Sequence, residues 1–461
     1  MSDAPTENVE VEIPIRTTMY EGKELRYKTP NSLTQWRVDT LFLEEPDTVR
    51  WISCMKEGEV LIDIGANVGM YSTLAAVGRN LRVYAFEPES QNHSLLNQNI
   101  YLNQVSEKVS GYCVALSDTS GLSQLYLGHM DAGGAFHSSG EALDFNLEPL
   151  NTPFVQGCVL MTLDQLVEEG TIPLPDHIKL DVDGFEYKVV NGMMNTIHNQ
   201  KVKSVAIELN PNLVEHQKVF QQMAELGFEY FENQRAESCL EDGPFKDIGN
   251  VIFYRAPWFE YETLYKTQIG PMRVQKSVAK MLKNLEQATN ITKATKATNV
   301  SKVSREQGDE AATNIVINNI FPAEFYQNLL TNIPSDNAFV CAETTNTAKT
   351  FELNATFINC LPGAAIPFWS QLSYELNSNE TLRSIVDACL GQNAQTQQQI
   401  FKSTAVIVRA ASPTLTHQPG ALITLWFDLN GANHLTVCTG ACALAAIDKN
   451  AEADMLKLVI S

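Results

Sequence analysis

The stretch VLIDIGANVGMYS, residues 60–72, joins a short apolar run to a glycine-containing turn and the start of a helix-length segment. Val60–Ile64 is typical of a buried β-strand. Gly65 and Gly69 allow the backbone to adopt positive φ angles and to approach a ligand closely. Asn67 tolerates a left-handed conformation with less strain than most side chains. The pattern predicts a strand–turn–helix unit whose turn binds a ligand.

The next apolar run, Arg82–Phe86, leads into Glu87, which follows Gly65 by 22 residues. An acidic side chain at the end of a second strand, about 20 residues beyond a glycine turn, suits a ribose diol. A dinucleotide-binding turn would have the spacing G-x-G-x-x-G, but Met70 stands where its last glycine belongs. The turn therefore favours a ligand that combines adenosine with an amino acid.

Short β-branched runs recur along the chain with helix-length segments between them, which predicts a parallel sheet covered on both faces. After the first two they are Val109–Ala115, His177–Leu180, Lys203–Leu209 and Asn250–Tyr254. Ligands of such sheets bind at the carboxyl ends of the strands. Acidic residues stand at the ends of the third, fourth and fifth runs at that edge: Asp118, Asp181 with Asp183, and Glu208. Single acids at strand ends are also ordinary helix caps, but the series indicates a functional edge.

Six motifs follow one another in order: D-x-G-A-N-x-G, F-E-P, A-L-S-D, T-L-D-Q-L, I-K-L-D-V-D-G-F-E and N-V-I-F-Y-R. Residues 41–255 thereby resemble the FkbM family of class I methyltransferases. The resemblance implies a doubly wound, Rossmann-like α/β sheet of seven strands, S-adenosylmethionine as methyl donor, and a hydroxyl acceptor on a small molecule or glycan. It places Asp63, Gly65, Asn67 and Gly69 at the methionine end, Glu87 at the ribose and Asp118 near the adenine. Asp183 departs from the family, which usually has Glu there.

Methyl transfer from a sulfonium is an in-line displacement that depends on positioning, and a hydroxyl acceptor must also lose its proton. A strand-end carboxylate is suited to general-base work; we assign it to Asp181 first and Glu208 second, with Asp183 beside them. Alternatively, Asp181, Asp183 and Glu208 would hold a divalent cation that acidifies the acceptor. We favour the metal-free base and assign no metal ligand.

The composition indicates which partners this protein is expected to avoid and in which cellular compartment it is expected to function. The formal net charge of −21 disfavours binding to nucleic acids and anionic membranes. No apolar run reaches the length of a membrane span, and the start of the chain lacks the pattern of a secretory leader. The nine cysteines are scattered, and the nearest pair, Cys438 and Cys442, has no matching ligand cluster. We therefore expect a cytoplasmic protein with free thiols and no zinc.

Residues 128–140, GHMDAGGAFHSSG, form a glycine-rich loop. Its His129-x-Asp131 pair has the spacing of two iron ligands, but a third ligand has no clear candidate. A lid over the substrate and a plain solvated connection are the two other interpretations.

We divide the chain into an N-terminal extension (1–40), the methyltransferase domain (41–256), a basic linker (257–310) and a smaller, mainly β domain (311–461). Val274, Val278, Met281 and Leu285 recur at helical spacing behind Pro271, so the linker should begin with a helix.

The last segment faintly resembles a 2-oxoglutarate/Fe(II) dioxygenase of the prolyl-hydroxylase type, which implies a jelly-roll-like fold. His417 matches the first iron ligand, but Pro419 stands where the carboxylate belongs, and His434 is an unusual second histidine. We interpret it as an accessory module without iron chemistry. Two other hypotheses stay open: a scaffold protein that has lost activity, and a bifunctional methyltransferase–oxygenase.

Overall fold

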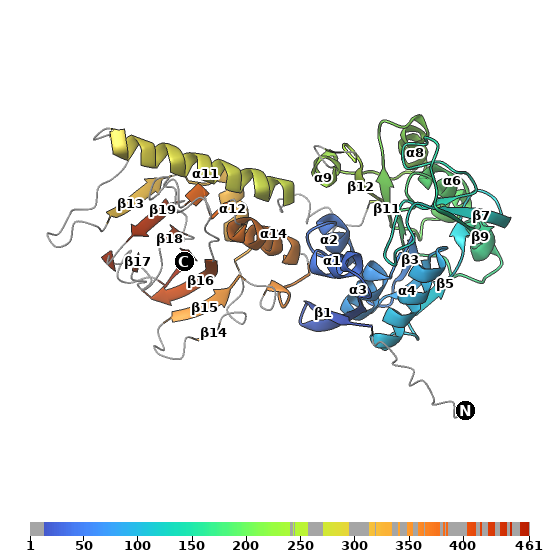
Figure 1. The fold of residues 1–461 in the computed structure, drawn as a ribbon, viewed down its shortest axis with the longest axis horizontal. Helices are drawn as coiled ribbons and strands as arrows, with labels where there is room; N and C mark the ends of the chain where they lie inside the picture. Colours follow the sequence, from blue (N-terminus) through green and yellow to red (C-terminus); the bar gives the residue numbers. More distant parts are fainter. Residues whose placement is uncertain are drawn as a thin grey trace, which may run out of the picture. The chain divides into compact units, whose positions relative to one another are not determined.

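The computed structural model describes most of the first 256 residues and parts of the remainder. The described residues are 13–239, 243, 245–256, 271–294, 313–318, 320–333, 340–341, 348–353, 358–363, 365–378, 381–382, 384–385, 403–411, 415–416, 423–428, 434–439, 443–444 and 452–460. The chain divides into two compact units, Met1–Phe259 and Glu260–Ser461. Each unit is considered by itself (Figure 1).

The first unit is built on a six-stranded sheet in the order β12-β11-β10-β3-β4-β5. The strands are β3 (Val60–Ile64), β4 (Arg82–Phe86), β5 (Val109–Tyr112), β10 (His177–Leu180), β11 (Ser204–Leu209) and β12 (Gly249–Tyr254). All neighbours run parallel except β12, which is antiparallel to β11. The expected α/β sheet is present. Where a seventh strand was expected, the described residues form only an isolated bridge between Glu229 and Tyr254.

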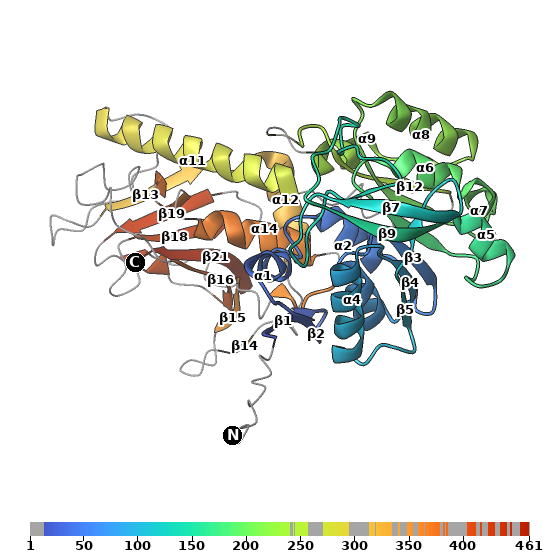
Figure 2. The same cartoon turned by 45° about the vertical axis from the view of Figure 1, so that its right-hand side comes forward.

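Helices cover both faces of this sheet (Figures 1 and 2). One face is covered by α2 (Pro46–Ser53), α3 (Met70–Arg79) and α4 (Ser90–Leu102), and the other by α5 (Leu163–Glu168), α6 (Glu186–Asn191), α7 (Met194–His198) and α8 (Val214–Glu225). All residues of β3, β10 and β12 are buried. The two helix layers bury both faces of these strands, including polar side chains such as Asp63, His177 and Lys179.

The third predicted strand is divided between two sheets. β5 ends at Tyr112, and the chain passes the exposed Cys113 before β6 (Ala115–Leu116) begins. β6 joins a separate four-stranded sheet in the order β6-β9-β7-β8, which also contains β7 (Gly121–Leu127), β8 (Ser138–Ser139) and β9 (Phe154–Met161). Asp118 was expected at the edge of the main sheet, and it follows β6 in this smaller sheet instead, because the chain leaves the main sheet before reaching it.

The N-terminal segment forms a hairpin of β1 (Ile15–Tyr20) and β2 (Lys23–Lys28), followed by α1 (Ser32–Asp39). The Tyr27 hydroxyl donates a hydrogen bond to the Met70 carbonyl at 3.0 Å. This bond ties the hairpin to the first residue of α3, immediately after the glycine turn.

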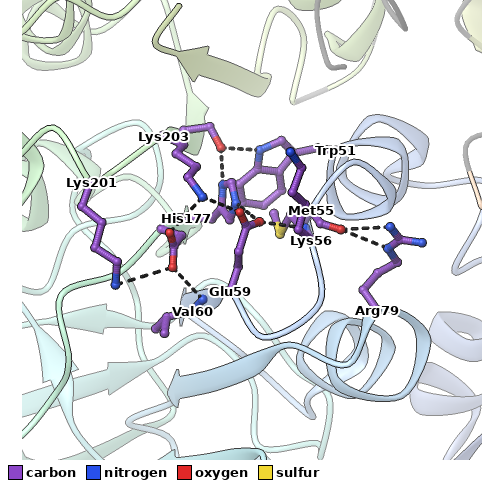
Figure 3. A network of polar contacts seen from close by, with 11 residues as sticks. Trp51, Met55, Lys56, Glu59, Val60, Arg79, His177, Lys201 and Lys203 are labelled. Carbon is purple, nitrogen blue, oxygen red and sulfur yellow. Dashed lines mark hydrogen bonds and ion pairs between the residues drawn. The ribbon is translucent and has the colours of Figure 1, made fainter. Parts of the chain in front are cut away.

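A buried polar network joins the amino-terminal ends of β10 and β11 to α2 and to the loop before β3 (Figure 3). The Trp51 indole N–H donates to Ser204 Oγ at 2.8 Å, and Ser204 Oγ lies 2.7 Å from His177 Nδ1. His177 Nε2 lies 2.9 Å from Glu59 Oε2, and Lys203 pairs with Glu59. The ionised Glu59 can only accept, so the imidazole proton is on Nε2; burial lowers the pKa of His177, and the Nδ1 of the neutral ring accepts from the Ser204 hydroxyl.

The second unit contains a seven-stranded antiparallel sheet in the order β13-β19-β18-β21-β16-β15-β14. Its strands are β13 (Thr313–Asn318), β14 (Val340–Cys341), β15 (Ala348–Glu352), β16 (Ser403–Ala411), β18 (Ile423–Asp428), β19 (His434–Thr439) and β21 (Glu452–Ile460), and a two-stranded sheet adds β17 (Leu415–Thr416) and β20 (Ala443–Leu444). The mainly β prediction is confirmed for the described residues. His417, Pro419 and Cys442 lie outside them, so the iron-ligand comparison stays a prediction.

The helix predicted behind Pro271 is α11 (Pro271–Ala294), and it belongs to the second unit. Its four predicted apolar positions are almost completely buried: Val274, Val278, Met281 and Leu285. It packs against α14 (Ile366–Asn377) and α12 (Ala323–Thr331). Across the described part of the chain, no helix is both long and apolar enough to cross a bilayer.

Candidate functional site

The glycine turn between β3 and α3 is sterically determined. Gly65 has φ +80°, and a Cβ at this position would lie 1.7 Å from the Asp181 carbonyl oxygen. Gly69 also has φ +80°, and its Cβ would lie 2.4 Å from Leu96 Cδ1. Asn67 takes the left-handed conformation with φ 50°, as the sequence predicts. Only glycine fits the first position, because the turn packs directly on the end of β10.

Asp63 leaves one buried oxygen without a hydrogen-bond donor. The side chain is 1% exposed, and Ser72 Oγ donates to its Oδ2 at 2.5 Å. Its Oδ1 has no hydrogen-bond partner among the described residues. Burial raises the pKa of this carboxyl. An unsatisfied buried acceptor is costly, so the position fits a ligand that brings a donor, such as an ammonium group.

Glu87 connects β4 to the glycine turn. The backbone N–H of Asn67 donates to Glu87 Oε2 and that of Glu89 to Oε1, both at 2.8 Å. Burial raises the pKa of Glu87 to about 8. Each carboxylate oxygen has a second lone pair, so Glu87 retains acceptor capacity for hydroxyl groups. The sequence placed Glu87 at this edge but did not predict that it would hold the turn.

Three carboxylates converge at the ends of β10 and β11. One oxygen each of Asp181, Glu186 and Glu208 lie within 4.8 Å of one another. Burial, reinforced by Asp181 and Glu186, raises the pKa of Glu208 well above its usual value. Burial also raises the pKa of Glu186 to about 8. Sequence reasoning missed Glu186, although it is the last residue of the I-K-L-D-V-D-G-F-E motif.

Glu186 is positioned by its own turn and by a histidine. It accepts hydrogen bonds from the Val182 N–H at 2.9 Å and the Gly184 N–H at 3.1 Å. His216 Nε2 lies 3.3 Å from Glu186 Oε2, and its Nδ1 accepts from the Asn210 N–H at 2.9 Å. This bond assigns the proton to Nε2, which donates to the Gly184 carbonyl at 3.0 Å and lies beside Glu186.

Lys179 places a positive charge inside the acidic cluster. Its side chain is 2% exposed, and Nζ lies 2.8 Å from Asp181 Oδ2 and 3.9 Å from Glu45 Oε2. Burial alone would lower the pKa of Lys179, but Asp181, Glu45 and Asp63 raise it above its usual value. Lys179 is therefore charged, and it forms an ion pair with Asp181. The sequence signal for it was a lysine in a short strand followed directly by an acidic residue.

Asp183 is separate from the three-carboxylate cluster. It has φ 56° and accepts hydrogen bonds from the N–H groups of Phe136 at 2.6 Å and His137 at 3.3 Å. Burial and the neighbouring Asp181 raise its pKa to about 7. The cation-binding alternative predicted from sequence used Asp183, whereas the geometry brings Glu186 to that place.

The loop at residues 128–137 is held beside the glycine turn by hydrogen bonds. The Gly134 carbonyl accepts from Asn67 Nδ2 at 2.8 Å and from Asn92 Nδ2 at 3.0 Å. Arg37 Nε donates to the Gly133 carbonyl at 2.9 Å. One group of side chains among the described residues is arranged so that it could hold a metal: Asp181, Glu186 and Glu208. It does not include His129 or Asp131.

Three phenylalanines from three loops meet beside Asp183, and we call Phe136, Phe145 and Phe245 the aromatic cluster. The ring centroids of Phe136 and Phe245 are 5.2 Å apart with an interplanar angle of 6°, and those of Phe145 and Phe245 are 4.8 Å apart. A Cβ on Gly184 would lie 2.9 Å from Phe145 Cα. The cluster therefore lies against the end of β10.

Asp118 is not brought into this site by any described contact. Its side chain is exposed, and Ser117 Oγ donates to it at 3.3 Å. A Cβ on Gly192, at the end of α6, would lie 3.2 Å from Asp118 Cα. The structure therefore brings together Asp63, Asp181 and Glu208 with the turn and Glu87, but not Asp118.

Residues 63–230 match the family model of the methyltransferase FkbM domain. Over 194 residues the chain is 29% identical to hexuronic acid methyltransferase AglP of Haloferax volcanii. The aligned region covers 41% of this chain and 72% of that protein. The family-model match covers the glycine turn and the three-carboxylate cluster.

Two solved structures show weaker similarity. Methyltransferase FkbM from Methylobacillus flagellatus is 13% identical with a TM-score of 0.30, covering 43% of this chain and 44% of that one. The chain thus spans less than half of that protein. Magnesium protoporphyrin IX methyltransferase from Synechocystis, solved with bound S-adenosylmethionine, is 11% identical with a TM-score of 0.29, covering 49% of this chain and 85% of that one.

Proposed function

We propose that this chain, whose residues 63–230 form a methyltransferase domain of the FkbM family, transfers a methyl group from S-adenosylmethionine to a hydroxyl oxygen of a glycan. The observation behind this proposal is the buried, unsatisfied Oδ1 of Asp63, beside a sterically determined glycine turn. The sugar acid named for the relative from Haloferax volcanii supports a carbohydrate acceptor.

The donor contributes a methyl group on a positively charged sulfur, which makes the methyl carbon open to attack by oxygen. We assign Asp63 to its ammonium group, because the orphaned oxygen needs a donor. Glu87 would accept from the ribose hydroxyls, and Gly65, Asn67 and Gly69 would line the methionine portion. Asp118 stays a candidate for the adenine end on sequence grounds alone.

Glu208 is the best candidate for the general base. A base works best when its pKa lies near the working pH, and the pKa of Glu208 is raised above its usual value. Glu208 would take the proton of the acceptor hydroxyl while that oxygen forms a bond to the methyl carbon. When bound, the donor would supply the methyl group and keep the electron pair of its carbon–sulfur bond on sulfur, so that S-adenosylhomocysteine would be the second product. The sequence ranked Asp181 first, but its Oδ2 is already paired with the Lys179 ammonium group at 2.8 Å.

A divalent cation at Asp181, Glu186 and Glu208 is the alternative assignment. The donor set is chemically suitable, since hard oxygens suit magnesium or manganese. However, Lys179 Nζ already lies 2.8 Å from Asp181 Oδ2, and a fixed ammonium group repels a second cation at this distance. We therefore propose the metal-free base.

Calorimetric titration of S-adenosylmethionine and S-adenosylhomocysteine into the full chain tests the donor site. We expect binding that weakens at least tenfold in Glu87→Ala and is unchanged in Glu107→Ala, an exposed acid beyond α4. Absence of binding to either compound would overturn the enzyme proposal in favour of a scaffold with a methyltransferase fold. A cytoplasmic location and the absence of nucleic-acid partners stay predictions from the sequence.

A further inference from the structure

We propose that Arg37 binds the carboxylate in the methionine portion of S-adenosylmethionine, so that α1 contributes a residue to the donor site. This inference rests on the proposed function, because it concerns the donor side of the same site. Arg37 lies before residues 63–230, which match the family model. The sequence motifs placed no site residue in this part of the chain.

The helix that carries Arg37 is joined to the loop beside the glycine turn. The Asn31 side chain caps α1 by accepting from the Thr34 N–H at 2.8 Å, and its Nδ2 donates to the Ala132 carbonyl at 2.8 Å. The packing is close, because a Cβ on Gly133 would lie 2.7 Å from Thr34 Cγ2. The position of Arg37 is therefore fixed by the contacts of α1 as well as by its own hydrogen bond.

Arg37 lies on the donor side of the site. Its Nε donates to the Gly133 carbonyl at 2.9 Å, and the next carbonyl, that of Gly134, accepts from Asn67 Nδ2 at 2.8 Å. Asn67 belongs to the turn that we assign to the methionine portion. Arg37 also acts on the first turn of α3: burial raises the pKa of Tyr71 well above its usual value, and the charge of Arg37 opposes this effect.

The guanidinium group of Arg37 retains donors for a ligand. The side chain is half-buried, and its Nη1 and Nη2 have no partner among the residues that the structure describes. The other buried or half-buried arginines in the described part of the first unit pair with a carboxylate or with several carbonyls: Arg26, Arg50, Arg79, Arg235 and Arg255. A guanidinium group presents its N–H donors in a planar fork that matches a carboxylate. Arg37 is therefore suited to a ligand that brings one.

The donor brings a carboxylate next to the ammonium group that we assign to Asp63. Both groups are attached to the same carbon atom, so a site that binds one must accommodate the other. Asp63 accepts from Ser72, the residue after Tyr71, so Asp63 and Arg37 both approach the first turn of α3.

Two other cations in this region are less suitable. Lys179 already lies 2.8 Å from Asp181 Oδ2, and Lys246 is exposed on the segment that carries Phe245. A carboxylate that leaves water needs hydrogen-bond donors and a compensating charge, and Arg37 offers both.

Calorimetric titration of the full chain with two matched ligands tests this assignment. The ligands are S-adenosylhomocysteine and its decarboxylated analogue, which keeps the ammonium group and lacks only the carboxylate. We expect the parent chain to bind S-adenosylhomocysteine at least about tenfold more tightly, as is typical of a hydrogen bond to a charged group. In Arg37→Gln the affinity for S-adenosylhomocysteine should fall by about the same factor, whereas the affinity for the analogue should change by less than about threefold.

Two further variants sharpen the test. Arg37→Lys should bind S-adenosylhomocysteine with intermediate affinity, because an ammonium group keeps the charge but loses the planar fork. Lys246→Gln is the matched control, since it removes the same charge from an exposed position, and we expect its affinities for both ligands to be unchanged. Thermal melting shows whether each variant is folded, and Arg37→Lys provides the test if Arg37→Gln is unfolded.

The outcomes that contradict the inference are distinguishable. An equal loss of affinity for both ligands in Arg37→Gln would show that Arg37 only holds the loop. Equal binding of the two ligands by the parent chain would also overturn the inference. An unchanged affinity for S-adenosylhomocysteine in Arg37→Gln would overturn it as well, and a raised KM for an acidic glycoside would then assign Arg37 to the acceptor. All of these results leave the proposed function intact, whereas failure of the parent chain to bind S-adenosylhomocysteine would overturn the proposed function.

Discussion

Removing one hydroxyl from the buried network at the start of β11 should destabilise the first unit measurably. Trp51, His177 and Ser204 are all 0% exposed. In Ser204→Ala the Trp51 indole N–H loses its acceptor, and His177 Nδ1 loses the hydroxyl that donates to it. A buried polar group that loses its partner costs about 1–3 kcal/mol. We expect the two losses together to lower the free energy of unfolding by about 2–4 kcal/mol, including relaxation.

Thermal unfolding of the full chain measures this effect. The first unit's transition is identified as the one that S-adenosylmethionine shifts. For a unit of this size, about 2–4 kcal/mol corresponds to a fall in Tm of roughly 4–16 °C. The matched control is Ser94→Ala, an exposed serine on α4, for which we expect a change within about 0.5 kcal/mol. An equally small change in Ser204→Ala would refute the reasoning.

Three further predictions concern the candidate site. Gly65→Ala should abolish donor binding in calorimetry. It should also destabilise the unit by at least about 1–2 kcal/mol because of its positive φ alone, and by more because of the clash with Asp181. Normal donor affinity in this variant would contradict the proposed role of the turn. Protonated Glu186 contributes stability that is lost as pH rises from about 4.5 to about 8. The Tm of Glu186→Gln should therefore rise relative to that of the parent chain between pH 5 and pH 8. A constant Tm difference across this range would show that Glu186 does not titrate there. Methyl transfer should survive exhaustive treatment with EDTA and no added metal, and loss of turnover restored by magnesium would favour the cation at Asp181, Glu186 and Glu208.

Local sequence pattern predicted the strands of the first unit closely, because each is a short apolar run between helix-length segments. β3, β4 and β10 have the predicted bounds. The run at Val109–Ala115 failed to continue as one strand, since pairing with β9 takes its last residues into another sheet. Apolar periodicity does not encode which neighbour a strand will pair with, so it did not predict that Asp118 would follow β6 of the smaller sheet.

The candidate site was predictable only where its residues follow strands directly. Asp63, Glu87, Asp181 and Glu208 stand at strand ends, so the topology brings them together. Glu45 is the residue before α2 and lies far from Lys179 in the sequence. No local sequence pattern predicts that their side chains lie close together. The same holds for the loop at residues 128–137, whose position depends on side-chain amides elsewhere in the fold.

Asn67 connects the two halves of the site. Its backbone N–H donates to Glu87 on the donor side, and its side chain donates to the Gly134 carbonyl in the loop that leads to Phe136. A donor that displaces Asn67 on binding therefore also displaces that loop. The affinities for donor and acceptor are then thermodynamically coupled, and each ligand changes the affinity for the other by the same factor. Calorimetric titration of S-adenosylhomocysteine with and without saturating acceptor should show this coupling as a change in its dissociation constant.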